Sequence, residues 1–299
     1  MSHSQIKVNY TLPQSSKNLY RTLFYGLLLP SIFLLIYIHQ MAHSIQAQDI
    51  SYIVQKSVWQ FDFEAFDLLY VYINIGTIIF PFLLSFDKKV HFYKKWKFVF
   101  PAILLNGIFF ILWDIYFTKI HVWGFNDKFI FTYILGLPLG EWLFFITVPY
   151  ACIFLHNCLT TYIQKDILQS IDKPFSLLFS ILLIVIGLLH SKQIYTLWAF
   201  VLAGTFLLCH YIFIPNTYRT KYYFSFLIIL IPFTIVNGLL TGLFTVEPVV
   251  VYNEKHHLIE SIGRRFLSIP IDDFIYAFLL LFIPVTLFEQ LKTTYKNQQ

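Results

Sequence analysis

Long apolar runs, separated by short polar segments, divide almost the whole chain. A hydrocarbon core about 30 Å thick needs about 20 mostly apolar helical residues to cross it. Eight runs fit this length, near residues 20–40, 66–86, 97–117, 129–157, 173–190, 194–213, 222–245 and 271–291. The pattern predicts an all-α, polytopic membrane bundle of about eight transmembrane helices. We interpret the first run as an anchor helix rather than a signal peptide, because seven further runs follow it.

Basic residues are unevenly distributed between the two sides of this predicted bundle. Lys and Arg are about twice as frequent on the side of the amino terminus, where Lys88, Lys89, Lys94, Lys95 and Lys97 share one loop. Cytoplasmic loops carry such an excess, so both termini are predicted to be cytoplasmic. This topology also accounts for the formal net charge of +5, which therefore needs no nucleic-acid partner.

Three landmarks occur in the same order in each half of the chain. They are an Asn-Gly pair, an aromatic residue followed by Asn, and a Pro-x-x-acid motif, recurring after about 130 residues. The first set is Asn106-Gly107, Phe125-Asn126 and Pro138–Glu141; the second is Asn237-Gly238, Tyr252-Asn253 and Pro270–Asp273. We predict two repeats, residues 1–160 and 161–299. With four helices each, they point the same way and place both acidic motifs on the face opposite the lysine-rich loop.

The composition supports the membrane assignment and narrows the chemistry. Hydrophobic residues make up 58% of the chain and charged residues 12%, far from the balance of soluble domains. Aromatic residues reach 20%, which fits either an interior for a conjugated ligand or the phenylalanine usage of an A+T-biased genome. Neither the three cysteines nor the His256-His257 pair forms a metal-binding pattern. Nucleotide-binding glycine motifs are also missing, so we predict neither a metal nor a cofactor.

Glu141 is the candidate acid that stands out most in the sequence. It lies in the apolar stretch Leu135–Phe145 with no cation nearby, and a carboxyl group at membrane depth tends to face a cavity, find a partner or stay protonated. A neutral carboxylic acid can donate a proton. The alternative is a structural Glu that is hydrogen-bonded to an interhelical amide, such as Asn106 or Asn237.

Asp272, Asp273 and Asp114 are the other candidate acids. The two neighbouring aspartates follow Pro270 at the start of the last apolar run, where acids also complement a helix dipole. Their correspondence to Glu141 under the repeat favours function over this capping role. Asp114 follows Trp113 near the end of the third run, and an interfacial position is its alternative. The Gly136/Gly140 and Gly238/Gly242 pairs have the spacing of closely packed membrane helices.

These residues together resemble the lycopene cyclase domain family, in its fused two-repeat form. The resemblance covers most of residues 60–290. It rests on Pro81–Lys89, Trp113-Asp114, Val122–Asn126, Pro138–Phe145, Asn237-Gly238, Val250–Asn253 and Pro270–Tyr276. Two positions depart from the family pattern. Gly140 stands where the family has the first acid of its Pro-x-Glu-Glu motif, and His121 stands where a glycine is expected.

The resemblance implies a carotenoid β-cyclase in a bacterial cell membrane, with a fold distantly similar to UbiA-type prenyltransferases. The implied substrate is a linear carotenoid such as lycopene, and the implied partners are membrane lipid and other carotenoid-pathway enzymes. Redox-neutral ring closure needs an acid, a base and a dry cavity, which assigns catalysis to Glu141, Asp273, Asp272 and Asp114. We expect substrate contacts from Asn106, Trp113, Trp123, Asn126, Pro138, Trp142, Phe144, Phe145, Asn237, Asn253, Pro270 and Tyr276.

Two other functions remain open on the sequence. One is a non-catalytic membrane binder or carrier of carotenoid or polyprenyl lipid, which has lost activity together with the first acid of its motif. The other is a UbiA-like prenyltransferase. The sequence lacks the aspartate-rich motifs that hold Mg²⁺ and a diphosphate, and the Asp272-Asp273 pair is its only doubled acid.

Overall fold

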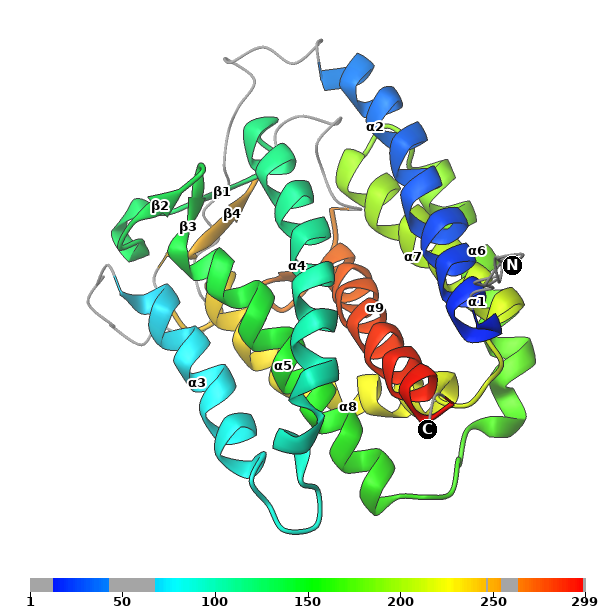
Figure 1. The fold of residues 1–299 in the computed structure, drawn as a ribbon. Helices are drawn as coiled ribbons and strands as arrows, with labels where there is room; N and C mark the ends of the chain where they lie inside the picture. The colour runs from blue at the N-terminus through cyan, green and yellow to red at the C-terminus, as the bar shows by residue number, and fades with distance from the viewer. Residues whose placement is uncertain (1–12, 43–67, 246, 254–262, 298–299) are drawn as a thin grey trace, which may run out of the picture.

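The computed structural model describes residues 13–42, 68–245, 247–253 and 263–297 (Figure 1). The His256-His257 pair, and some of the basic residues that bear on orientation, such as Lys56, lie outside this part of the chain.

All eight predicted apolar runs form helices, which confirms the all-α membrane bundle. Among the described residues seven helices are long and apolar enough to cross a membrane, and α3 is a shorter apolar helix of 16 residues. The first span is α1 (Gln14–Leu23), a π-helical turn (Phe24–Leu28) and α2 (Leu29–Ala42). The others are α3 (Leu69–Leu84), α4 (Trp96–Lys119), α5 (Leu139–Tyr162), α6 (Asp172–Leu189), α7 (Ile194–Phe213), α8 (Arg219–Leu240) and α9 (Ile271–Lys296).

Two predicted helix boundaries were wrong, because turns interrupt the apolar runs. The run at 129–157 begins its helix only at Leu139, since Leu135 and Gly136 adopt φ values of 52° and 83° in a hairpin turn. The run at 222–245 ends its helix at Leu240, and Gly242 follows with φ 88°. Gly136 and Gly242 therefore serve turns that favour glycine, and the predicted close-packing pairs do not lie within single helices.

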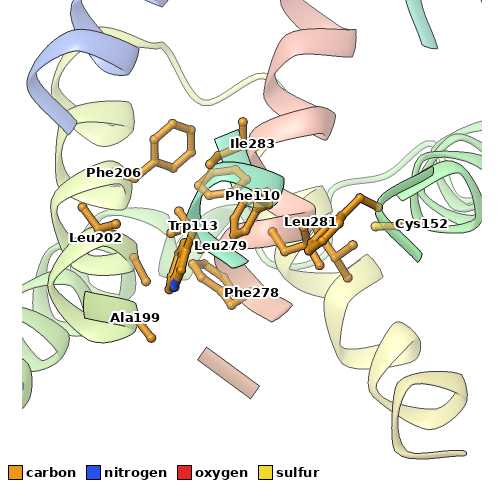
Figure 2. Close-up of a cluster of buried hydrophobic side chains, with 14 of the residues drawn as sticks. Phe110, Trp113, Cys152, Ala199, Leu202, Phe206, Phe278, Leu279, Leu281 and Ile283 are labelled. Atoms are coloured by element: carbon orange, nitrogen blue, oxygen red, sulfur yellow. The ribbon is translucent and has the colours of Figure 1, made fainter. Parts of the chain in front are cut away.

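Helix α9 forms the centre of the bundle. It packs against α4, α5 and α7 (Figure 1), and 78% of its most apolar window is buried, compared with 22% for α6. A helix that is apolar on all sides is expected in a protein core or across a membrane, and α9 is the one enclosed most fully by neighbouring helices among the described spans. Figure 2 shows the resulting core, in which α9 side chains such as Phe278 and Ile283 meet Phe110 and Trp113 from α4 and Leu202 and Phe206 from α7.

Small residues allow the closest helix contacts. A Cβ atom on Gly204 of α7 would stand 2.7 Å from the Ser180 carbonyl oxygen of α6, and one on Gly26 would stand 3.0 Å from the Phe206 Cα of α7. Without a hydrophobic driving force between helices in lipid, such close packing stabilises their association. These glycines thus fix α7 between α6 and the first span.

The two described chain ends meet at the lysine-rich end of the bundle. The Ser15 and Thr294 hydroxyl oxygens lie 3.3 Å apart. The Lys97 ammonium group stands 3.7 Å from the centre of the Tyr295 ring, and the Lys95 ammonium group donates to Asn157 at 2.6 Å. Both described ends therefore lie on the same side as the loop between α3 and α4, as an even number of spans requires.

Candidate active site

Short strands build the opposite end of the bundle, where α4 and α8 end and α5 and α9 begin. Strand β1 (Trp123–Phe125) follows α4, β4 (Val250–Tyr252) follows α8, and the two pair antiparallel with Trp123 opposite Tyr252 (Figure 1). Two hairpins, β2–β3 (Tyr133–Ile134, Leu137–Pro138) and β5–β6 (Arg265–Phe266, Ile269–Pro270), lead into α5 and α9. Both Pro-x-x-acid motifs therefore open helices at the same end.

Glu141 lies in the first turn of α5 and is 8% exposed. The Tyr70 hydroxyl of α3 donates to its Oε1 at 2.6 Å. Asn74 of α3 donates to the Gly140 carbonyl oxygen at 3.0 Å and accepts from the Thr147 hydroxyl at 2.6 Å. The start of α5 is thus held against α3 by hydrogen bonds on either side of the carboxyl group.

Asp273 lies in the matching position on α9 and is more fully hydrogen-bonded. Its Oδ1 accepts from the Tyr195 hydroxyl of α7 at 2.7 Å. Its Oδ2 accepts from the Asn237 amide of α8 at 2.7 Å and from the Tyr252 hydroxyl of β4 at 2.8 Å. Three donors from three elements stabilise an ionised carboxylate. The two repeat-related acids therefore have different surroundings.

The other two candidate acids differ in their relation to the site. Asp272 is fully buried and accepts from the Thr196 hydroxyl at 2.5 Å, which joins α9 to α7. Asp114 of α4 is 2% exposed. Its Oδ1 accepts from the Trp123 indole at 2.6 Å, and its Oδ2 has no hydrogen-bond partner among the described residues. Asp114 shares one cavity with Glu141 and Asp273, and Asp272 is not among the described residues that line it.

This acid-lined cavity has a volume of about 70 Å³ and lies among α4, α5, α8 and α9. Three carboxyl groups and a shell of aromatic rings face it. Its wall comprises Tyr70, Asp114, Trp123, Glu141, Phe144, Val148, Tyr195, Phe233, Asn237, Leu240, Val250, Tyr252, Asp273, Tyr276, Ala277, Leu280 and Leu281. The structure therefore brings together three of the four predicted acids with Trp123, Phe144, Asn237 and Tyr276 from the predicted substrate contacts.

The aromatic rings of the wall support one another through edge-on contacts. The Trp123 ring centre lies 5.2 Å from that of Tyr195 and 6.4 Å from that of Tyr276. Behind them, the Trp113 ring centre lies 4.9 Å from that of Tyr276. Ring faces attract cations through their quadrupole, more strongly where water is excluded. The wall is therefore suited to stabilising positive charge on an apolar molecule.

Three further predicted contacts are buried behind the wall. Trp113 and Phe145 pack with Phe110 at ring distances of 5.3 and 6.3 Å. Asn106 of α4 is 1% exposed, and neither polar atom of its side-chain amide has a hydrogen-bond partner within the described part of the chain. Its counterpart Asn237 donates to Asp273. Each half therefore has an Asn at the corresponding helix position, and of the two only Asn237 of α8 donates a hydrogen bond to an acid in this structure.

The remaining predicted contacts serve the loops around the site. Asn126 accepts from the Lys128 amide and donates to Glu247 at 2.9 Å, and the Trp142 indole donates to the Ile134 carbonyl oxygen at 3.0 Å. Asn253 is 1% exposed, and its backbone N–H donates to the Val122 carbonyl oxygen at 3.1 Å. Pro138 and Pro270 precede α5 and α9 in extended conformations. None of these five is among the described residues that line the cavity.

Both departures from the family pattern have a structural explanation. His121 adopts φ 60°, a left-handed conformation that favours glycine, so a glycine at this place would relieve strain. Gly140 faces the Tyr70 ring, and a Cβ atom there would stand 2.2 Å from the ring's Cγ. The Tyr70 ring thus fills the space that the first acid of the motif would need.

Three tyrosines that hold the acids were missed by the sequence predictions. Tyr70 and Tyr195 are each the second residue of their helix, α3 and α7, and Tyr252 belongs to the aromatic-Asn landmark. A buried tyrosine hydroxyl usually requires a partner, and this was the available signal. The sequence could not name the partners, because Tyr70 and Glu141 are 71 positions apart.

Two groups near the paired strands β1 and β4 have shifted pKa values, Tyr252 in β4 and Glu247 in the loop before it. Burial, followed by the negative charge of Asp273, raises the pKa of the Tyr252 phenol well above its usual value, so this phenol stays a hydrogen-bond donor. The Lys128 ammonium group lies 2.7 Å from Glu247. Hydrogen bonds from Lys128 and Asn126 lower the pKa of the Glu247 carboxyl group, and they tie the loop after β1 to the loop before β4.

The described residues contain no group of three His, Cys, Asp or Glu side chains that could hold a metal ion. The three carboxyl groups of the cavity are accompanied by tyrosine, tryptophan and amide donors instead.

A comparison with protein-family models matches this chain to the model described as lycopene cyclase, over residues 67–159 and 192–291. The first segment covers α3, α4 and most of α5, and the second covers α7, α8 and most of α9. Tyr70, Glu141, Tyr195 and Asp273 all fall within the matched residues. Searches of curated proteins and of solved structures found no match.

Proposed function

This chain belongs to the lycopene cyclase family, and from that premise we propose that it converts the linear ψ ends of lycopene to β-ionone rings. The family assignment supports carotenoid cyclisation as the general activity and a carotenoid as the class of substrate. The observation that carries the finer proposal is the pair of repeat-related acids, Glu141 and Asp273, facing one aromatic cavity in the membrane-spanning bundle.

Glu141 is proposed as the proton donor. Protonation of the terminal double bond gives a tertiary cation, and the neighbouring double bond attacks it to close the ring. The proton must come from a neutral acid that is held at the substrate. In the part of the chain that the structure describes, Glu141 accepts one hydrogen bond, from Tyr70. Its surroundings are largely apolar, and burial without a cation favours the neutral carboxylic acid.

Asp273 is proposed as the base that removes the ring proton. Loss of this proton restores a double bond, so atoms and charge balance with no oxidant or reductant. The three hydrogen bonds that Asp273 accepts stabilise its ionised form, which is the form that accepts a proton. Different surroundings for two matched acids separate the roles of donor and base.

The cavity wall is proposed to protect the intermediate cation. Trp123, Tyr195 and Tyr276 present rings around the space between the acids, and they stabilise positive charge without adding a nucleophile. Exclusion of water prevents hydration of the cation. In this arrangement Asp114, held by the Trp123 indole, adds a third carboxyl group that favours cationic intermediates.

Topology completes the proposal. We retain two repeats, residues 1–160 and 161–299, in a bacterial cell membrane with both termini cytoplasmic. The basic residues near both described chain ends support this orientation. The acid-lined cavity then lies toward the opposite face of the membrane, and the substrate reaches it from the lipid.

Expression in a lycopene-accumulating host tests the function. We expect monocyclic and bicyclic carotenes by chromatography of the pigments. Glu141→Gln removes the transferable proton and keeps the shape, so we expect at least a hundredfold loss of product at an unchanged protein level. Glu247→Gln makes the same chemical change at a loop carboxyl group outside the cavity and should keep full activity.

Absence of any cyclic product from the wild-type protein, under conditions where a known cyclase is active, would refute the proposed reaction. Purified protein that carries carotenoid and never cyclises it would support a membrane binder or carrier. Full activity of Glu141→Gln would leave the reaction in place and remove Glu141 from the role of donor.

A further inference from the structure

A second and much larger cavity lies beside the acid-lined one, between α3, α5 and α8. Its volume is about 720 Å³, and its walls are almost wholly apolar. It extends along α3 from Leu69 to Leu84, a helix length of about 22 Å at about 1.5 Å per residue. We refer to it as the α3 groove.

The α3 groove adjoins the acid-lined cavity and shares part of its wall. Phe144 and Val148 of α5, Phe233 and Asn237 of α8, and Leu281 of α9 line both spaces. Asn237 also donates to Asp273, so one side chain touches the proposed base and the groove at once. A molecule that fills the groove therefore ends beside the reacting groups.

The groove reaches the surface that faces lipid. Tyr72, Phe80 and Leu84 of α3 are 54%, 68% and 53% exposed, and Ile235 of α8 is 53% exposed, yet all four line it. Exposed apolar side chains on membrane-spanning helices contact acyl chains. An apolar molecule dissolved in the bilayer can thus enter from the side, without passing through water.

The acid-lined cavity alone is too small for the substrate. An apolar cavity of roughly 150 Å³ is known to bind benzene, and the 70 Å³ available here is less than half of that. A methylated ring end must therefore displace side chains at the junction, and the rest of a long molecule must lie elsewhere. Phe144 and Phe233, which line both spaces, stand at this junction.

The two halves are unequal in this respect. Tyr70 of α3 and Tyr195 of α7 bind the two acids in matching ways. Helix α7, however, is covered by α6, with Gly187 against Val201 and Gly204 against Ser180. No described helix covers α3 in this way along the groove, and a Cβ atom on Gly76 would meet no described atom within 4 Å.

We propose that the α3 groove binds the conjugated chain of a linear carotenoid, with one end of the molecule in the acid-lined cavity. This inference rests on the proposed function for the identity of the ligand. A rigid, apolar chain fits a long groove with few polar groups, and the junction orders its end before proton transfer. The two ends of the substrate then use the same cavity in successive binding events.

Substitutions at Gly76 test the groove, because this position opens into it and is unobstructed. Gly76→Phe fills the groove, and Gly76→Ala makes the same backbone change without the bulk. Ile75→Phe adds the same ring to the neighbouring position of α3, which is 47% exposed and does not line the groove. We expect Gly76→Phe to lower product formation at least tenfold and Gly76→Ala to lower it much less, with Ile75→Phe within about twofold of wild type.

A binding measurement separates this proposal from the proposed reaction. Purified wild type, Gly76→Phe and Ile75→Phe are incubated with lycopene in detergent, and bound pigment is measured by absorbance. We expect Gly76→Phe to lose at least nine-tenths of the pigment that the other two retain. If wild type binds lycopene through the groove but forms no ring, the proposed reaction fails and the groove stands.

Equal pigment on Gly76→Phe and wild type would assign the groove to lipid acyl chains and overturn the proposal. Pigment on neither protein would overturn it as well. Cyclisation by wild type with undiminished activity in Gly76→Phe would keep the reaction and exclude the groove as the binding site for the substrate.

Discussion

The ring of Tyr70 occupies the space that any side chain at position 140 would need. In Gly140→Ala, the new Cβ atom would stand 2.2, 2.4 and 2.7 Å from three ring atoms, compared with 3.4 Å or more in ordinary contact. The ring must therefore move by about 1 Å or more. Its hydroxyl donates to Glu141 at 2.6 Å, so this movement breaks or distorts the contact that orients the proposed proton donor.

Stability and activity should respond differently to Gly140→Ala. Overpacking a buried site destabilises a protein by about 1–3 kcal/mol. Replacing glycine by alanine in a helix offsets up to about 1 kcal/mol of this. The folded protein should therefore persist. Misplacement of a reacting group by about 1 Å can reduce the rate on the order of a hundredfold. We therefore expect product formation to fall roughly 30-fold to 100-fold.

The assay measures carotene products and membrane-inserted protein for four variants in a lycopene-accumulating host. Gly76→Ala is the control for the steric effect on folding, because the same change there meets no described atom within 4 Å and should leave the level of folded protein unchanged. Tyr70→Ala removes the obstacle, so Gly140→Ala should cause no further loss in that background. Wild-type activity of Gly140→Ala, or additive losses in the double variant, would refute the idea that the Tyr70 ring keeps position 140 empty.

Two further predictions concern the proposed base. Asp273→Asn should reduce product formation at least a hundredfold at an unchanged protein level. Asp272→Asn changes a carboxyl group bound to Thr196, and it should lower product mainly by lowering the amount of protein. Equal turnover per molecule in both variants would contradict the assignment of Asp273 as the base. Tyr252→Phe removes one of three donors to Asp273 and should lower turnover about tenfold, measured as the initial rate in isolated membranes. An unchanged rate would show that the remaining donors, such as Asn237, are enough to keep Asp273 active.

Hydropathy predicted the eight helical runs well, because the requirement to cover a hydrocarbon core is local along the chain. It was less reliable at the ends of the runs. Ile130 and Leu137 are as apolar as helix residues, yet they precede α5, and the left-handed conformations at Leu135 and Gly136 form a hairpin there. Apolar content does not distinguish a helix from a buried turn, and the glycine was the available signal.

The sequence by itself determined the membrane bundle, the order of landmarks and the acidic pair at the start of the last helix, because each depends on residues close together in the chain. That Glu141 also lies at the start of a helix came from the structure. Only the tertiary structure decided what those acids contact. Tyr70 reaches Glu141 from α3, and Tyr195, Asn237 and Tyr252 reach Asp273 from three other elements. These partners lie 21 to 78 positions away, so packing of whole helices brings them together, and with them the difference between the two halves.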